Sequence, residues 1–172
     1  MPGKVIGTTF NNGFPGHYAE QPDMLIKTFP NAGDKTIPFG APVFSVAGGV
    51  AAAGTAGLAP TAALFKGIAA AQVKSALSYP DQSVGEYTTE QAMPVFERGA
   101  VSVYVSNAAV NAPAIDGNVY VRISAGTPTT PVGGIEAEAD GTNTIQITNA
   151  VFGSAADVNG VAEIVLKTRN NA

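Results

Sequence analysis

The chain has 172 residues, 13% of them charged, and a formal net charge of −4 at neutral pH. This length suits one domain. The charged fraction is about half the roughly 25% of an average domain, and no broad cationic surface is available, so a nucleic-acid partner is not expected. Cysteine is absent, which excludes disulfides and thiolate metal sites and suits a reducing cytoplasm. Neither a signal peptide nor a membrane-spanning apolar run is found, so no membrane partner is expected.

The low charge also leaves the surface poorly protected against association. Composition alone fits two interpretations equally well. One is a stable β protein built from small residues, and the other is a protein whose surface is largely covered by a partner.

Residues 1–36 are rich in proline and glycine and keep neither a helical nor a strand period for long. We expect an extended N-terminal arm that lies on its own domain or on a neighbour's. Its one short strand candidate is residues 24–29. Its aromatic side chains are candidate anchors at a contact surface, and they include Phe10, Phe14, Tyr18 and Phe29.

Residues 37–172 are expected to form the folded domain. Residues 37–42 read as a turn and residues 43–46 as a strand, with Pro42 at an edge or first position because it has no N–H to donate. The Gly/Ala/Thr-rich run at 48–60 predicts a loop. It lacks the Gly-Lys-Ser/Thr ending of a phosphate-binding loop.

Residues 61–77 are ambiguous. Alanine and leucine favour a helix, and Leu64, Phe65, Ile68 and Val73 roughly share a helical face. However, Gly67 interrupts the run, and residues 65–69 also read as a strand.

Two strands are predicted with most support, at residues 100–105 and 119–123, as a hairpin-like pair. Valines alternate with other residues in both, which places one face in a core. The predicted core residues are Val101, Val103, Val119 and Val121. Gly99 and the Asp116-Gly117 pair are expected to punctuate the strands, and Glu97-Arg98 to pair with neighbouring charges.

Three further strands are expected at residues 135–139, 144–148 and 161–166, and a short edge begins at Val151-Phe152. Asp140-Gly141 and Asn159-Gly160 supply turn signals between them. The fold class predicted is therefore mainly β: an antiparallel β-barrel or sandwich with an extended N-terminal arm and at most one short helix.

Catalytic, cofactor-binding and metal-binding residues are not predicted. His17, the only histidine, has no Gly-x-Ser-x-Gly elbow to accompany it, and a single histidine without cysteine makes no zinc site. Glu136, Glu138 and Asp140 would share one face of a strand, which we interpret as a solvated acidic face. A weak calcium or magnesium site and a carboxylate-based hydrolase are the alternatives.

Arg122 lies between strand residues near Tyr120 in the sequence. It is a candidate for stacking on an aromatic ring at an interface, and plain surface exposure is an equal alternative. Tyr104 and Tyr120 could instead form the stacking platform of a carbohydrate- or cell-surface-binding β module.

Several short stretches together resemble the structural cement (capsid decoration) proteins of tailed bacteriophages. The stretch 97–105 resembles the family's Arg-Gly-x-Val-x-Val strand, and 65–69 resembles its Phe-x-Gly-Ile-Ala strand. The other matching stretches are 79–87, 116–121 and 160–166. They follow the family's order over roughly residues 37–166, and the resemblance favours a strand at 65–70 that pairs near Val43-Phe44. It leaves a short helix open around 59–64 or 71–77.

The resemblance implies a structural protein of the virion with no enzymatic activity and no cofactor. It would bind the outer capsid surface, bridge major capsid subunits and stabilise the head. It would also self-associate, as a homotrimer in preference to a homodimer, after synthesis in the bacterial host cytoplasm. The contact residues predicted are Phe10, Phe14, Tyr18, Phe29 and Arg122.

Overall fold

The structure is a computed structural model that describes residues 12–20, 23–71 and 85–168. Its helical elements are two 3₁₀ turns, η1 (Ala62–Leu64) and η2 (Gly141–Asn143). The strands are β1 (Leu25–Pro30), β2 (Ile37–Pro38), β3 (Pro42–Val46), β4 (Gly49–Ala52), β5 (Phe65–Ala69), β6 (Glu86–Tyr87), β7 (Ala92–Tyr104), β8 (Asn118–Arg122), β9 (Ile135–Glu136), β10 (Thr144–Phe152) and β11 (Val161–Leu166). The predicted mainly β, antiparallel architecture is confirmed.

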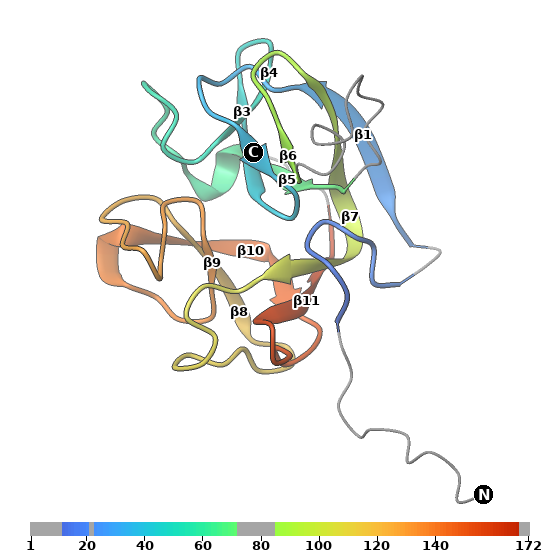
Figure 1. The fold of residues 1–172 in the computed structure, drawn as a ribbon, viewed down its shortest axis with the longest axis vertical. Coiled ribbons are helices and arrows are strands. Elements are labelled where there is room, and N and C mark those ends of the chain that lie inside the picture. The colour runs from blue at the N-terminus through green and yellow to red at the C-terminus, as the bar shows by residue number, and fades with distance from the viewer. Residues whose placement is uncertain (1–11, 21–22, 72–84, 169–172) are drawn as a thin grey trace, which may run out of the picture.

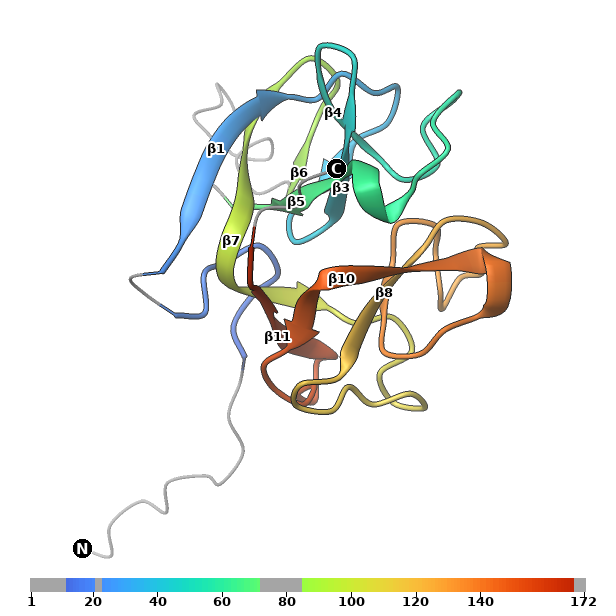
Figure 2. The ribbon, with the colours of Figure 1, turned by 180° about the vertical axis from the view of Figure 1, so that it is seen from behind.

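The long strand β7 organises the molecule. Nine strands form one sheet in the order β4-β3-β5-β7-β11-β10-β8-β9, with β1 on the same β7. The first half of β7 pairs with β1 and β5, and its second half pairs with β11. Figures 1 and 2 show β7 passing from the upper group of strands into the lower group. Each half of the sheet curls back on itself and is joined by an isolated β-bridge. Asn31 pairs with Val50 in the upper half, and Val105 pairs with Ile135 in the lower half.

Gly99 lies where β7 changes partners. Its φ is +110°, and a Cβ at this position would meet the carbonyl oxygen of Asp23 and the Cα of Met24. Gly99 therefore lets the strand bend beneath a crossing segment. Two expectations are corrected here: the strand begins at Ala92 and runs through Gly99, and β7 and β8 form no hairpin because β11 and β10 lie between them.

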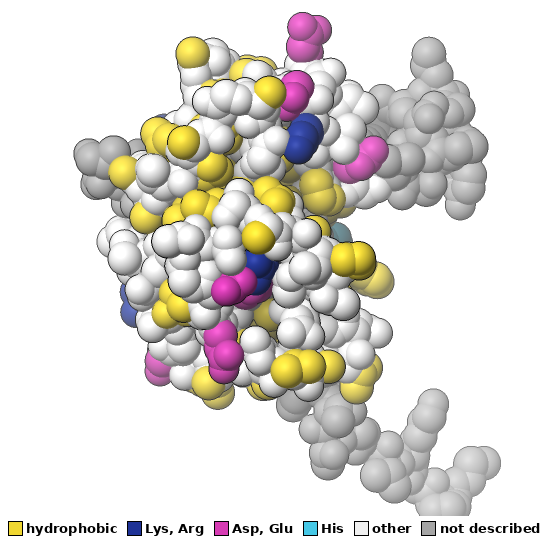
Figure 3. All heavy atoms as spheres, turned by 90° about the vertical axis from the view of Figure 1, so that its left-hand side faces the viewer, with side chains coloured by type: hydrophobic (Ala, Val, Ile, Leu, Met, Phe, Trp, Pro, Cys, Tyr) yellow, Lys and Arg dark blue, Asp and Glu magenta, His cyan; other side chains and the backbone are white. Residues whose placement is uncertain are grey.

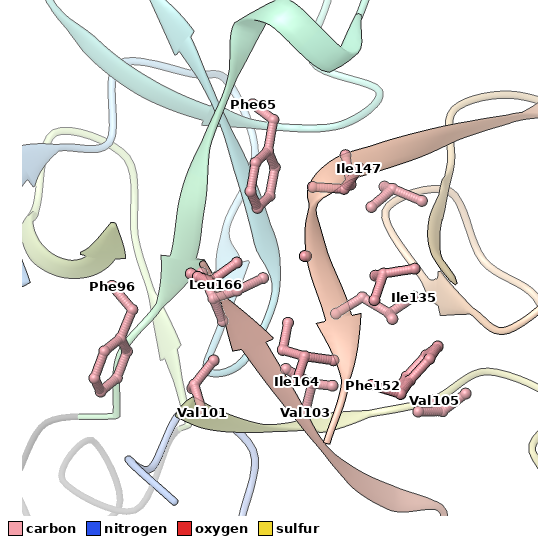
Figure 4. Close-up of a cluster of buried hydrophobic side chains, with 14 of the residues drawn as sticks. Phe65, Phe96, Val101, Val103, Val105, Ile135, Ile147, Phe152, Ile164 and Leu166 are labelled. Carbon is pink, nitrogen blue, oxygen red and sulfur yellow. The ribbon is translucent and has the colours of Figure 1, made fainter. Parts of the chain in front are cut away.

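The four predicted core valines are all buried, as expected from strand alternation. Val101 and Val103 pack with Ile164 and Phe152 from β11 and β10 inside the lower half of the sheet (Figure 4). Full burial of such side chains contributes about 1.5–3 kcal/mol each to folding. A second cluster, which includes Ile37, Val43, Tyr87 and Met93, fills the upper half.

The ambiguous segment resolves into a turn followed by a strand. Residues 62–64 form η1, residues 65–69 form β5, and β5 pairs with β3 at Val43 and Phe44, as the resemblance implied. Residues 72–77 of that prediction lie outside the described residues. A Cβ on Gly67 would collide with the backbone carbonyl of Phe96, so the glycine is what allows β5 to approach β7.

Three loop or strand predictions need correction. The loop predicted at 48–60 contains the strand β4. Val50 and Ala51 are both buried there, so both faces of the strand are covered by small residues, and the sequence shows no alternation of buried and exposed positions. The turn predicted at 37–42 begins with the short strand β2. Residues 135–139 supply only the two-residue strand β9. Pro42 is the first residue of β3, as predicted.

The N-terminal segment lies on its own domain wherever it is described. The predicted strand at 24–29 appears as β1. Before it, the chain runs beside the second half of β7: the N–H of Gly16 donates to the carbonyl of Ser102, and the N–H of Ser102 donates to the carbonyl of His17, both at 2.8 Å. Phe29 is half-buried against the upper core cluster. Residues 1–11 and 21–22 of the predicted extended arm lie outside the described residues, and the division between arm and domain at residue 36 stays a prediction.

Candidate interaction surface

Asn12 is held by a clasp of four hydrogen bonds at the point where the described chain begins. Its backbone N–H donates to the Oδ2 atom of Asp157 at 3.0 Å. Its side-chain amide donates to the carbonyl oxygens of Ala155 and Val161 at 2.9 and 2.8 Å. Its own carbonyl accepts from the hydroxyl of Ser102 at 2.5 Å. The position of this residue on the body is thus fixed from several sides.

Asp157 is the centre of that clasp. Its Oδ1 atom accepts from the backbone N–H groups of Asn159 and Val161 at 2.8 and 3.0 Å, which closes the turn before β11. Burial alone would raise the pKa of this carboxyl. The backbone donors on Val161, Asn12 and Asn159 outweigh burial and hold the pKa below its ordinary value.

Two adjoining cavities form a groove beside the end of β7. The first has a volume of about 400 Å³ and is lined by Phe39, Val132 and other mainly apolar residues. The second, of about 640 Å³, is lined by small residues and by Val158. Both share the walls formed by Tyr104 and Pro131. We call the two cavities together the Tyr104 groove.

Large apolar side chains are exposed along the rim of the Tyr104 groove. Tyr104 is 54% exposed and Val158 is 92% exposed. Figure 3 shows hydrophobic side chains spread over one face of the molecule, with acidic and basic side chains between them. Exposed apolar groups around a concave surface are typical of an interaction site.

Arg122 is buried, and it braces one wall of the Tyr104 groove. Its guanidinium donates to both carboxylate oxygens of Glu136 at 2.6 and 3.0 Å, and it lies 2.9 Å from a carboxylate oxygen of Asp140. Its backbone N–H donates to the carbonyl of Gly134, and its carbonyl accepts from the N–H of Gly133. The hydrogen bond to Glu136 raises the pKa of Arg122 above its ordinary value. Residues 133–136 are thereby fixed to β8.

Comparisons with known proteins identify the family. A model of the family described as "Structural cement protein (E217 gp24/Pam3 gp6)" matches residues 2–167. The chain belongs to this structural cement family.

A solved structure titled "The capsid of Myoviridae Phage XM1" contains a chain that shares the fold of this cement protein. The TM-score is 0.64 at 19% sequence identity, and the match covers 99% of this chain and 98% of that one. Comparison with curated proteins found no match.

The predicted contact residues of the cement protein are not gathered at one place. Phe14 and Tyr18 are 73% and 53% exposed on the segment beside β7. Phe29 faces inward, with the ammonium of Lys66 5.2 Å from its ring centroid. Phe10 lies outside the described residues. Arg122 contacts carboxylates in the place of the expected aromatic ring, and its side chain is only 6% exposed.

The expected acidic face is not formed. Glu136 is buried against Arg122, whereas Glu138 is exposed beyond the end of β9. Within the described ranges no group of three or more carboxylate or histidine side chains is placed to hold a metal ion. The i, i+2, i+4 spacing does not place the three carboxylates on one face, because strand β9 ends after two residues, at Glu136.

The other residues considered from sequence have separate settings. His17 is exposed, with its ring 6.0 Å from that of Phe14. Tyr104 and Tyr120 lie on β7 and β8, which are separated in the sheet by β11 and β10. Glu97 is buried with the ammonium of Lys66 at 2.8 Å, and Arg98 pairs with Asp23 at 2.8 Å, so the predicted charge pairing at these two residues is confirmed.

The clasp of Asn12 and Asp157 was missed from the sequence. Asp157, Asn159 and Gly160 carry a recognisable turn signal, but nothing local links that turn to a residue 145 positions earlier. As for the membrane, none of the helical turns in the described residues has the length and hydropathy to cross one.

Proposed function

We propose that this cement protein binds the outer surface of a phage head, where it bridges neighbouring major capsid subunits and stabilises the shell. The observation that carries the proposal is the family match over residues 2–167. The protein would reside in the virion after synthesis in the host cytoplasm. Its role would be mechanical, without catalysis and without nucleic-acid or membrane partners.

The geometry supports this role in two ways. The single curled sheet with a shared strand β7 makes a stiff body, as a bridge under load requires. Exposed apolar residues at Phe14, Tyr18 and the Tyr104 groove offer contact area at low desolvation cost. Many copies on a symmetric shell would add modest contacts into strong overall attachment.

We further propose self-association, as a homotrimer in preference to a homodimer. A trimer at a threefold position would place three equivalent bodies around one junction of capsid subunits. Sedimentation equilibrium of the purified chain tests the stoichiometry. A stable dimer, or a protein that stays monomeric at the highest concentration measured, would contradict it.

The direct test of attachment is to mix the purified protein with undecorated capsids of its phage and measure co-sedimentation. The Phe14→Asp and Tyr18→Asp variants should bind more weakly, because each places a charge where an apolar contact forms. Ile115→Asp is the matched control, since Ile115 is comparably exposed at 69% but lies on the loop before β8 and not on the segment 12–20 that carries Phe14 and Tyr18. Wild-type protein that fails to bind capsids would overturn the proposed function.

A further inference from the structure

The Tyr104 groove is suited to one kind of occupant. It consists of two cavities of about 400 and 640 Å³ with Tyr104 and Pro131 in both linings, each within the range of ordinary ligand sites. Its lining is mainly apolar, and Lys35 and Asp157 are its only charged residues. The carboxylate of Asp157 is already used by three backbone N–H groups. Such a groove suits an extended, nearly uncharged peptide, because a charged one would lose its hydration without a partner.

Residues 1–11 have the matching chemistry. The sequence is Met-Pro-Gly-Lys-Val-Ile-Gly-Thr-Thr-Phe-Asn, in which Lys4 is the only charged side chain and Val5, Ile6 and Phe10 are apolar. Pro2, Gly3 and Gly7 disfavour a helix. Fully extended, eleven residues reach about 36 Å, which is enough to cross from one copy to a neighbour.

The clasp determines where this segment starts. Asn12 is bonded to Asp157, Ala155 and Val161, and the turn that holds it, residues 155–160, is also one wall of the Tyr104 groove. In Figures 1 and 2 the described chain begins below β7. The turn at residues 155–160 therefore holds the root of the arm and also lines the groove, so in every copy the groove lies beside that copy's own root.

We propose that residues 1–11 of one cement protein dock in the Tyr104 groove of a neighbouring copy. This arm exchange rests on the proposed function for its setting, because the capsid surface holds the copies side by side. Val158 and Tyr104 line the groove that receives the arm. The Arg122–Glu136 pair keeps the opposite wall, residues 133–136, in place.

Single-cysteine cross-linking tests the proposal. The natural chain has no cysteine, so only the introduced cysteines can form disulfides. Two separately purified variants, Val5→Cys and Val158→Cys, are mixed and oxidised, both in concentrated solution and on capsids. A disulfide forms only if the two Cα atoms come within about 7 Å. Arm exchange predicts a mixed dimer on non-reducing electrophoresis, several-fold more abundant than with the control pair Val5→Cys and Ile115→Cys.

The outcomes separate the two proposals. Capsid co-sedimentation of the same mixture reports the proposed function, whereas the mixed dimer reports arm exchange. Decorated capsids without an excess of the mixed dimer over the control pair, in either setting, would overturn arm exchange and leave the proposed function standing. Efficient closure of an intrachain disulfide in the double variant Val5→Cys/Val158→Cys, with no interchain product, would show that the arm folds back on its own groove and would also overturn the exchange.

Discussion

Gly67 sets the distance between β5 and β7. Because a Cβ there would collide with the Phe96 carbonyl and φ is +154°, Gly67→Ala must both strain and displace the strand. We expect a loss of about 3 kcal/mol in the free energy of unfolding, measured by urea denaturation. The control Gly57→Ala also has positive φ but open space around it, and should cost only about 1 kcal/mol. Equal losses would show that the close approach does not matter.

Arg122 is a buried charge whose removal is expected to be costly. Arg122→Met leaves Glu136 buried without its partner, so we predict a loss of about 3–5 kcal/mol in the free energy of unfolding. The double variant Arg122→Met/Glu136→Leu removes both charges and should regain most of that loss. Thermal and urea unfolding of the three proteins measure both values. A single-variant loss as small as that of a surface pair, about 1 kcal/mol or less, would contradict this account.

Tyr87 makes stability sensitive to high pH. Its hydroxyl donates to the carbonyl of Ala70 at 2.6 Å, and burial raises its pKa from 10.0 to about 12. A pKa that is raised in the folded state means stability that is complete below pH 10 and lost as pH rises from 10 to 12. The loss should reach about 3 kcal/mol. Tyr87→Phe should flatten the fall of unfolding free energy with pH over this window, and an unchanged slope would refute the assignment.

At the scale of elements, residues 12–20 should behave as part of the sheet. Deleting residues 1–11 keeps Asn12 and its hydrogen bonds to Asp157, Ala155 and Val161, and should leave the unfolding free energy almost unchanged. Deleting residues 1–20 removes the bond from the N–H of Ser102 to His17 and opens the side of β7. Hydrogen exchange at Ser102 should therefore accelerate strongly only in the longer deletion. Comparable protection in both would show that the segment is not held to β7.

The strands that could be predicted from the sequence are those in which core-facing residues visibly alternate with others. Val101, Val103, Val119 and Val121 were placed in the core correctly because each strand has one covered face. Strand β4 was missed because Val50 and Ala51 are buried on both faces and alanine carries little pattern. The family resemblance of residues 65–69 predicted the strand correctly, whereas helical propensity did not. Gly67 is required by its close approach to Phe96, a tertiary contact that local propensity does not reflect.

The candidate site was harder to predict than the fold. The aromatic content of the N-terminal segment drew attention to Phe14 and Tyr18, which are indeed exposed. Arg122 was predicted to stack at an interface or to be exposed, because a single sequence does not show that Glu136 lies close by on the neighbouring strand β9. The Asn12–Asp157 clasp joins residues 145 positions apart through backbone groups, and no local pattern encodes that pairing.

At the scale of the whole molecule, the described strands join two curled halves through β7, and the Tyr104 groove lies beside the end of that strand. In the proposed function, a stiff body of this kind would transmit load between attachment points, which the exposed apolar residues and the N-terminal arm would provide. The same design explains the low charge, because contact surfaces are depleted of charged residues at their centres.

The central claim is that the protein strengthens a phage head by binding to it. The decisive measurement is the temperature at which genome-filled heads lacking the protein rupture, before and after the purified chain is added. The account predicts saturable binding in a fixed ratio to the capsid subunits and a higher rupture temperature, with a smaller gain for Phe14→Asp than for Ile115→Asp. An unchanged rupture temperature at saturating protein would contradict it.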